Sequence, residues 1–127
     1  ALKSVVEMKG DISFGERLFT KAKCSQCHTV RQDEVQKGPY LGNIARTYKR
    51  PELATAVLDP SKSIAQGFIT NIIQTHDDET ITGFVTNEQN DRVMLRDAQG
   101  KEYLVMKDNI AARKTSTVSS MPTGLMN

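Results

Sequence analysis

Two cysteines and a histidine lie within five consecutive residues, Cys24-Ser25-Gln26-Cys27-His28. They are the only two cysteines of the 127-residue chain. A disulfide bond between them would close a very small loop, so they do not form the disulfide framework of a small secreted domain. The spacing therefore indicates two thiols that act together with the histidine beside them.

The pattern Cys-x-x-Cys-His is the attachment signal for c-type haem. Each thiol adds across one vinyl group of the haem to form a thioether, and the two intervening residues match the distance between the vinyl groups. The histidine that follows reaches the iron as an axial ligand. The sequence thus predicts one covalent haem c, held by Cys24 and Cys27 and ligated by His28.

Two other chemistries use closely spaced cysteines. A structural zinc site needs four ligands, and the two cysteines, His28 and His76 are all the cysteines and histidines in the chain. His76 falls in an expected hairpin turn, which is a poor position for a fourth ligand. A thioredoxin-like redox pair follows a strand and begins a helix, whereas a helix is expected before Cys24. Haem attachment is favoured, and a zinc-binding interaction module is the remote alternative.

Apolar residues at helical spacing predict short helices on both sides of this motif. The helix before the motif can begin at Asp11 or Ser13, both of which are N-cap residue types. A later helix can begin at Pro51, which suits a first helical turn. The expected helical segments are 1–9, 12–22, 41–48 (a short helix or turn) and 51–58.

From residue 68 onward the apolar period changes from 3.6 to 2, and clusters of Asp, Asn and Gly interrupt the pattern at hairpin spacing. This change predicts a four-stranded antiparallel meander over about 68–106. A charged short helix or turn and a Ser/Thr-rich stretch are expected in 107–127. The expected strands are 68–75, 80–86, 91–96 and 102–106.

The chain resembles class I c-type cytochromes in four segments: 10–19, 24–28, 38–42 (Gly-Pro-Tyr-Leu-Gly) and 120–122 (Ser-Met-Pro). More narrowly, it is similar to the haem-binding domains common in planctomycete and verrucomicrobial proteins. The residues that carry this narrower resemblance lie in 58–61, 82–85, 107–110 and 119–122. The resemblance implies a single monohaem domain over 1–127, often a module of a longer chain. It implies a mainly α, cytochrome c-like fold around the haem, with the meander as an insertion.

The resemblance also implies how the haem would be held. The carbonyl of Pro39 would accept a hydrogen bond from the imidazole of His28, which fixes the ring and leaves its other nitrogen for iron. Leu41, Ile44 and Tyr48 would line the haem, a role that overlaps with an ordinary place in the core.

The second axial ligand is expected to be one of five methionines: Met8, Met94, Met106, Met121 and Met126. Met94 and Met106 fit as strand side chains. Met121 precedes Pro122, which favours an extended backbone and a stiff loop, and the resemblance places the axial methionine there. Met121 is therefore the expected ligand, with His76 or an open, water-ligated position as alternatives.

Class I cytochromes normally end in a helix that crosses the first helix, and no such helix is expected after Met121. The apolar side chains of the helix before the motif, Phe14, Leu18 and Phe19, would then lack their usual cover. Three arrangements would supply it: residues 1–9 folded back over this face, a homodimer, or a helix on a longer chain. We expect the last.

The net charge is only +2, which argues against a dedicated nucleic-acid binder. No run of about 18 apolar residues could span a membrane. Residues 1–64 contain 11 Lys and Arg against 7 Asp and Glu, whereas residues 65–127 contain 6 against 8. The basic half would steer a redox partner, or a fused dehydrogenase domain, that has an acidic docking face; a random imbalance of surface charge explains it equally well.

These features predict a periplasmic or otherwise exported domain that carries electrons by outer-sphere transfer, with His28 and Met121 as axial ligands. No acid–base pair or nucleophile constellation is visible beside the motif, so the chain is not expected to be an enzyme by itself. The alternative is a haem-based sensor or peroxidase-like domain with a labile or vacant distal site.

Overall fold

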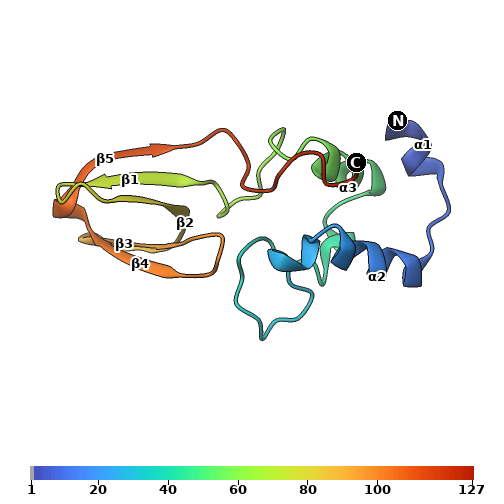
Figure 1. The fold of residues 1–127 in the computed structure, drawn as a ribbon, viewed down its shortest axis with the longest axis horizontal. Helices are drawn as coiled ribbons and strands as arrows, with labels where there is room; N and C mark the ends of the chain where they lie inside the picture. Colours follow the sequence, from blue (N-terminus) through green and yellow to red (C-terminus); the bar gives the residue numbers. More distant parts are fainter. Residues whose placement is uncertain (1) are drawn as a thin grey trace. The chain divides into compact units, whose positions relative to one another are not determined.

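The computed structural model describes residues 2–127, which form two compact units (Figure 1). We call the first the helical unit; it contains the described residues up to Ser63 together with Met121–Asn127. The second, Ile64–Ser120, is the sheet unit. The sheet unit is therefore an insertion, and the chain passes between the units twice.

The helical unit contains three short α-helices and two 3-10 turns. The prediction of helices over 12–22 and 51–58 is confirmed within one residue at each end. The bounds are α1 Leu2–Glu7, α2 Ile12–Lys21, η1 Cys24–Gln26, η2 Ile44–Arg46 and α3 Arg50–Leu58.

Side chains at the N-termini explain where α2 and α3 begin. The Asp11 carboxylate accepts a hydrogen bond from the backbone N–H of Phe14 at 2.7 Å, which satisfies one of the free amides of the first turn of α2. At α3 the carboxylate of Glu52 reaches back and accepts from the N–H of Lys49 at 2.6 Å, and Pro51 lies in the first turn.

α1 packs against α3, where Arg50 Nη2 donates a hydrogen bond to the carbonyl of Met8 at 2.6 Å. The face of α2 that the sequence marks as apolar is only partly covered: Leu18 and Phe19 are partly buried, whereas Phe14 is exposed. Phe14 is 53% exposed, and a side chain placed at Gly15 would meet no neighbouring atom of the described residues. Residues 2–9 therefore leave Phe14 uncovered, so the first of the three arrangements considered above does not account for that side chain.

The sheet unit is a five-stranded antiparallel sheet with strand order β4-β3-β2-β1-β5. Its core consists of aliphatic side chains that alternate along the strands, as expected for strands with one buried face. The buried side chains are Ile73, Ile81, Val93, Leu95 and Val105. The strands are β1 Asn71–Thr75, β2 Thr80–Glu88, β3 Arg92–Arg96, β4 Glu102–Met106 and β5 Ile110–Thr115, with the 3-10 turn η3 at Lys107–Asn109 before β5.

Gly83 marks a close crossing within this sheet. A Cβ atom at Gly83 would collide with the backbone carbonyl of Arg96, because β2 and β3 approach closely there. The register of β2 against β3 shifts between Val85 and Asn87, which indicates a β-bulge just beyond this crossing.

The expectation of a mainly α fold is wrong: helices take up 27% of the chain, and the sheet has five strands rather than four. The four expected strands are present, but β5 falls where a charged helix or turn was expected. Its sequence, Ile-Ala-Ala-Arg-Lys-Thr, has no period-2 apolar pattern, and of its six residues only Ile110 is partly buried. β5 forms by pairing with β1 over Asn71–Thr75, a tertiary contact that local sequence does not reveal.

Residues 121–127 contain no helix. Across the described chain, residues 2–127, none of the helices is long and apolar enough to cross a lipid bilayer.

Candidate haem-attachment site

The two cysteines and the histidine are brought together by one tight turn after α2. The carbonyl of Cys24 accepts hydrogen bonds from the N–H groups of Cys27 at 3.2 Å and of His28 at 2.9 Å. Lys23, just before this turn, has a left-handed backbone with φ of 64°. Both thiols are free and partly exposed. The turn thus places two thiol groups and an imidazole on adjacent parts of the backbone.

The imidazole of His28 is held by the loop that follows it. Its Nδ1 lies 2.8 Å from the carbonyl oxygen of Pro39, and the ring is partly buried. A carbonyl only accepts, so Nδ1 carries the proton and donates it, which leaves the lone pair on Nε2. This is the hydrogen bond that the resemblance implies, and it leaves Nε2 available for a metal ion.

Two backbone features close that loop onto the motif. The N–H of Leu41 donates to the carbonyl of Thr29 at 2.8 Å. Gly38 is buried with its α-carbon against the backbone of Cys27, and a Cβ there would come within 3.2 Å of the Cys27 carbonyl oxygen. A larger residue at 38 would push this loop, and with it Pro39, away from the histidine.

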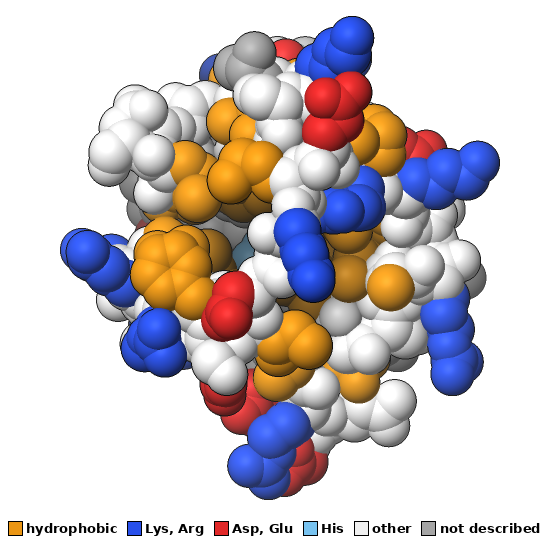
Figure 2. All heavy atoms as spheres, turned by 90° about the vertical axis from the view of Figure 1, so that its right-hand side faces the viewer, with side chains coloured by type: hydrophobic (Ala, Val, Ile, Leu, Met, Phe, Trp, Pro, Cys, Tyr) orange, Lys and Arg blue, Asp and Glu red, His pale blue; other side chains and the backbone are white. Residues whose placement is uncertain are grey.

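The predicted apolar lining residues follow on the same segment. The N–H of Ile44 donates to the carbonyl of Leu41 at 3.2 Å, and the N–H of Tyr48 donates to that of Ile44 at 3.0 Å. Leu41 and Ile44 are partly buried, whereas Tyr48 is exposed. On the face drawn in Figure 2, hydrophobic side chains gather around a hollow in which part of a histidine side chain is visible.

Met121, the predicted second ligand, is partly buried and belongs to the same compact unit as His28, although 92 residues separate them in sequence. His76, the alternative ligand, lies in the turn between β1 and β2 of the sheet unit. Among residues 2–127, no three His, Cys, Asp or Glu side chains gather as a metal site would require. The zinc alternative therefore finds no support in the arrangement of side chains.

The helical unit fits a bound haem on two observations of its own residues. First, among its described apolar side chains only that of Pro60 is buried, so the unit lacks an apolar core of its own. Second, the hydroxyl of Thr29, directly after His28, is buried without a hydrogen-bond partner among the described residues. Such orphaned polar atoms are rare in complete sites. Sequence reasoning missed Thr29, because nothing in its local pattern signals burial.

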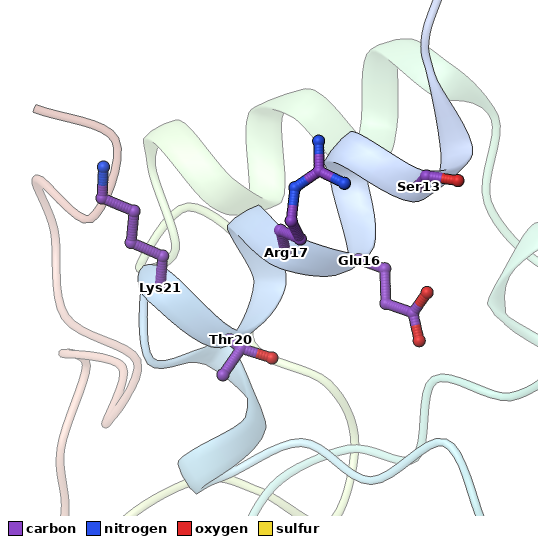
Figure 3. Close-up of a pocket in the computed structure, with 5 residues that line it drawn as sticks. All are labelled: Ser13, Glu16, Arg17, Thr20 and Lys21. Atoms are coloured by element: carbon purple, nitrogen blue, oxygen red, sulfur yellow. The ribbon is translucent and has the colours of Figure 1, made fainter.

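A separate open hollow lies along α2 and is lined by Ser13, Glu16, Arg17, Thr20 and Lys21 (Figure 3). All five side chains are exposed, and all come from one helix. None of the predicted site residues lines it, so it is a surface groove and not a second part of the attachment site.

The turn after α2, the histidine fixed through Nδ1 and the two free thiols together have the arrangement that attachment of a c-type haem requires. A sequence model of the family described as Cytochrome c matches residues 12–104. The match covers most of the chain, and the protein therefore belongs to the cytochrome c family. Met121 lies beyond the matched residues. No curated protein sequence matches the chain.

Proposed function

We propose that this chain is an electron-transfer domain with one covalent haem c, ligated by His28 and Met121. The observation that carries the proposal is the 2.8 Å hydrogen bond from His28 to Pro39, beside two free thiols on the same turn. When bound, haem c supplies a one-electron Fe(III)/Fe(II) couple.

Each residue has a distinct part in holding such a group. Cys24 and Cys27 would tether it through thioether bonds. The carbonyl of Pro39 keeps the ring of His28 in one orientation and one tautomer, so that Nε2 stays a lone-pair donor. The sulfur of Met121 would favour the reduced state and raise the reduction potential relative to a second imidazole.

Two axial side chains leave no open position for a substrate, which supports an electron carrier rather than an enzyme. The alternative is a sensor or peroxidase-like domain, in which Met121 would be displaced easily or would not bind at all. The sheet unit is inserted between His28 and Met121 in sequence, which supports a relationship to the haem-binding domains of planctomycete and verrucomicrobial type.

The partner we propose is a redox protein, or a fused dehydrogenase domain, with an acidic docking face. Residues 1–64 contain the motif and an excess of Lys and Arg, 11 against 7 acidic residues. Such an excess attracts an acidic surface and speeds association at low salt. Membership of the cytochrome c family supports an exported or periplasmic location. A homodimer through the exposed face of α2 remains the alternative use of that face.

Haem content tests the proposed cofactor. Protein matured in cells with a working haem-ligation apparatus should be coloured, and acidified acetone should not extract the haem. Cys24→Ala or Cys27→Ala should weaken or abolish attachment, while Ser25→Ala, between them, should not. Colourless protein from cells that mature another c-type cytochrome would refute the proposal.

The ligand is tested separately by replacing methionines. Met121→Ala should abolish the weak far-red absorption of ferric iron bound to thioether sulfur, lower the potential and open the iron to cyanide and carbon monoxide. Met106→Ala, in β4, is the matched control and should leave all three properties unchanged. If Met94→Ala or Met106→Ala removes the band instead, the assignment of Met121 is wrong.

A further inference from the structure

The segment that leads from the sheet unit to Met121 is anchored where it leaves β5. The N–H of Ser116, the residue after β5, donates to the carbonyl of Thr70 at 2.8 Å. Thr70 directly precedes β1, so the strands that enter and leave the sheet unit are joined at their ends.

β5 itself is fixed by a side-chain network. Arg113 donates through Nε to the side-chain oxygen of Asn71 at 3.2 Å and through Nη2 to Glu88 at 2.8 Å. Lys107 forms a second ion pair with Glu88 at 3.1 Å. The strand that ends at Thr115 is thus bonded to both β1 and β2, and these bonds hold the backbone at Ser116 in place against the sheet.

Ser116 then folds the chain directly after β5 into a local turn. Its Oγ accepts a hydrogen bond from the N–H of Val118 at 3.1 Å and lies 3.4 Å from the carbonyl of Val118. This is a local hydroxyl-to-backbone turn of the kind that serine favours. The side chain of Val118 is 64% exposed, so apolar packing does not hold this turn. Two residues separate Val118 from Met121.

We propose that Ser116 is a positioning residue for Met121: its hydroxyl turn determines how firmly the following loop holds the thioether at the haem iron. The inference rests on the proposed ligand role of Met121. Loss of the turn would give the short segment before Met121 more conformations, and the ligand-off state would gain most. Loss of one hydrogen bond of ordinary net strength shifts such an equilibrium about two- to tenfold.

The test is a cyanide titration of the full-length, haem-loaded ferric protein. Ser116→Ala removes the Oγ acceptor but keeps the backbone bond to Thr70. We expect its apparent cyanide affinity to rise about two- to tenfold, with a weaker far-red band, faster exchange of the Val118 amide and unchanged haem content. Ser116→Thr retains a hydroxyl and should restore all three readouts.

Thr86→Val is the matched control, because the hydroxyl of Thr86 also bonds to a backbone carbonyl of this sheet, that of Met94 at 3.4 Å, but not on the exit toward Met121. The proposal is overturned if Ser116→Ala leaves cyanide affinity and the band unchanged. It is also overturned if Thr86→Val raises the affinity equally, since the effect would then be general loosening of the sheet. Failure of the ligand assignment is distinguishable, because Met121→Ala would then change neither cyanide affinity nor the far-red band.

Discussion

The two units bury apolar surface in different ways. The sheet unit encloses Ile73, Val93 and Leu95 completely, and its strands pair in an unbroken order from β4 to β5. In the helical unit the buried residues are Thr29, Gly38 and Pro60, and its large apolar side chains are at least partly exposed. The sheet unit thus has its own source of stability, whereas the helical unit needs a further apolar component.

The two units also differ in which residues their ion pairs join. In the sheet unit, most ion pairs join separate elements: Glu88 on β2 binds Lys107 and Arg113, and Arg96 on β3 binds Glu102 on β4, whereas Asp91 pairs with its neighbour Arg92. The pair found in the helical unit, Arg31 with Asp33, links residues two apart on an exposed loop. Most ion pairs of the sheet unit therefore link separate elements, whereas the pair in the helical unit links only neighbouring residues of one loop.

The largest expected effect follows from separating the haem from the chain. A double variant, Cys24→Ala with Cys27→Ala, should lack covalent haem and leave the helical unit without a core. Amide hydrogen exchange should then show protection over β1 to β5 but not over α2 and α3. Protection of α2 and α3 in the haem-free chain would show that the helical unit folds on its own and would break the comparison.

The next effect is confined to the sheet unit. Leu95 is 0% exposed, and Leu95→Ala should cost about 2–5 kcal/mol of unfolding free energy through the cavity it leaves. Leu104→Ala is the control on the neighbouring strand; that side chain is 55% exposed, so its loss should cost well under about 1 kcal/mol. Urea unfolding followed by sheet circular dichroism measures both. Equal costs would show that the assigned core does not stabilise the sheet.

The sequence predicted most elements because their signals are local. α2 has a capping aspartate and an apolar face, and the strands β1 to β4 have period-2 patterns bounded by turn residues. β5 has neither, since its side chains are mostly exposed and its position depends on β1. The expectation that helices outweigh strands is wrong for a related reason. The resemblance rests on the motif and its helices, whereas much of the regular structure lies in the inserted sheet unit.

At the candidate site, spacing alone identified Cys24, Cys27 and His28, because the chemistry requires them side by side. The resemblance supplied Pro39, eleven residues further on, and the hydrogen bond to His28 is present. The burial of Thr29 and the contact of Gly38 with Cys27 depend on how the loop closes. No pattern of residue types encodes such closure, so these two positions required the structure.

A smaller effect tests whether paired charges stabilise the sheet unit. Hydrogen bonds and ion pairs from Arg113 and Lys107 lower the pKa of Glu88 from 4.5 to about 2. A lowered carboxyl pKa stabilises the fold above the ordinary pKa, and the contribution is lost as the pH falls through about 2. Glu88→Gln should therefore cost about 0.5–1 kcal/mol at pH 7, a modest value because the carboxylate is partly exposed.

The measurement is urea unfolding of the sheet unit as a function of pH. The difference between Glu88→Gln and the parent should shrink between about pH 4.5 and pH 2 and vanish below it. Asp91→Asn is the control, since Asp91 pairs with Arg92, its neighbour in sequence, and should cost less. A cost for Glu88→Gln that does not change with pH would mean that packing, and not charge, explains it.

The smallest effect compares two strained backbone positions, one in each unit. Lys23 and Asp78 have φ values of 64° and 62°, and this left-handed region costs a lysine more than an aspartate. Replacement by glycine removes the strain of the folded backbone. It also raises the conformational entropy of the unfolded chain, and this cancels about 0.4–1 kcal/mol of the gain in unfolding free energy. Lys23→Gly should therefore stabilise by about 0.5 kcal/mol, and Asp78→Gly should be near neutral.

Because Lys23 precedes the attachment turn, its gain should appear in unfolding of the haem-loaded protein, monitored by haem absorbance, and disappear in the haem-free double cysteine variant. The Asp78 variant should behave alike in both backgrounds, since the sheet unit folds in each. A gain for Lys23→Gly that persists without haem would mean that the helical unit is already ordered before attachment, and the contrast between the two units would then be one of degree.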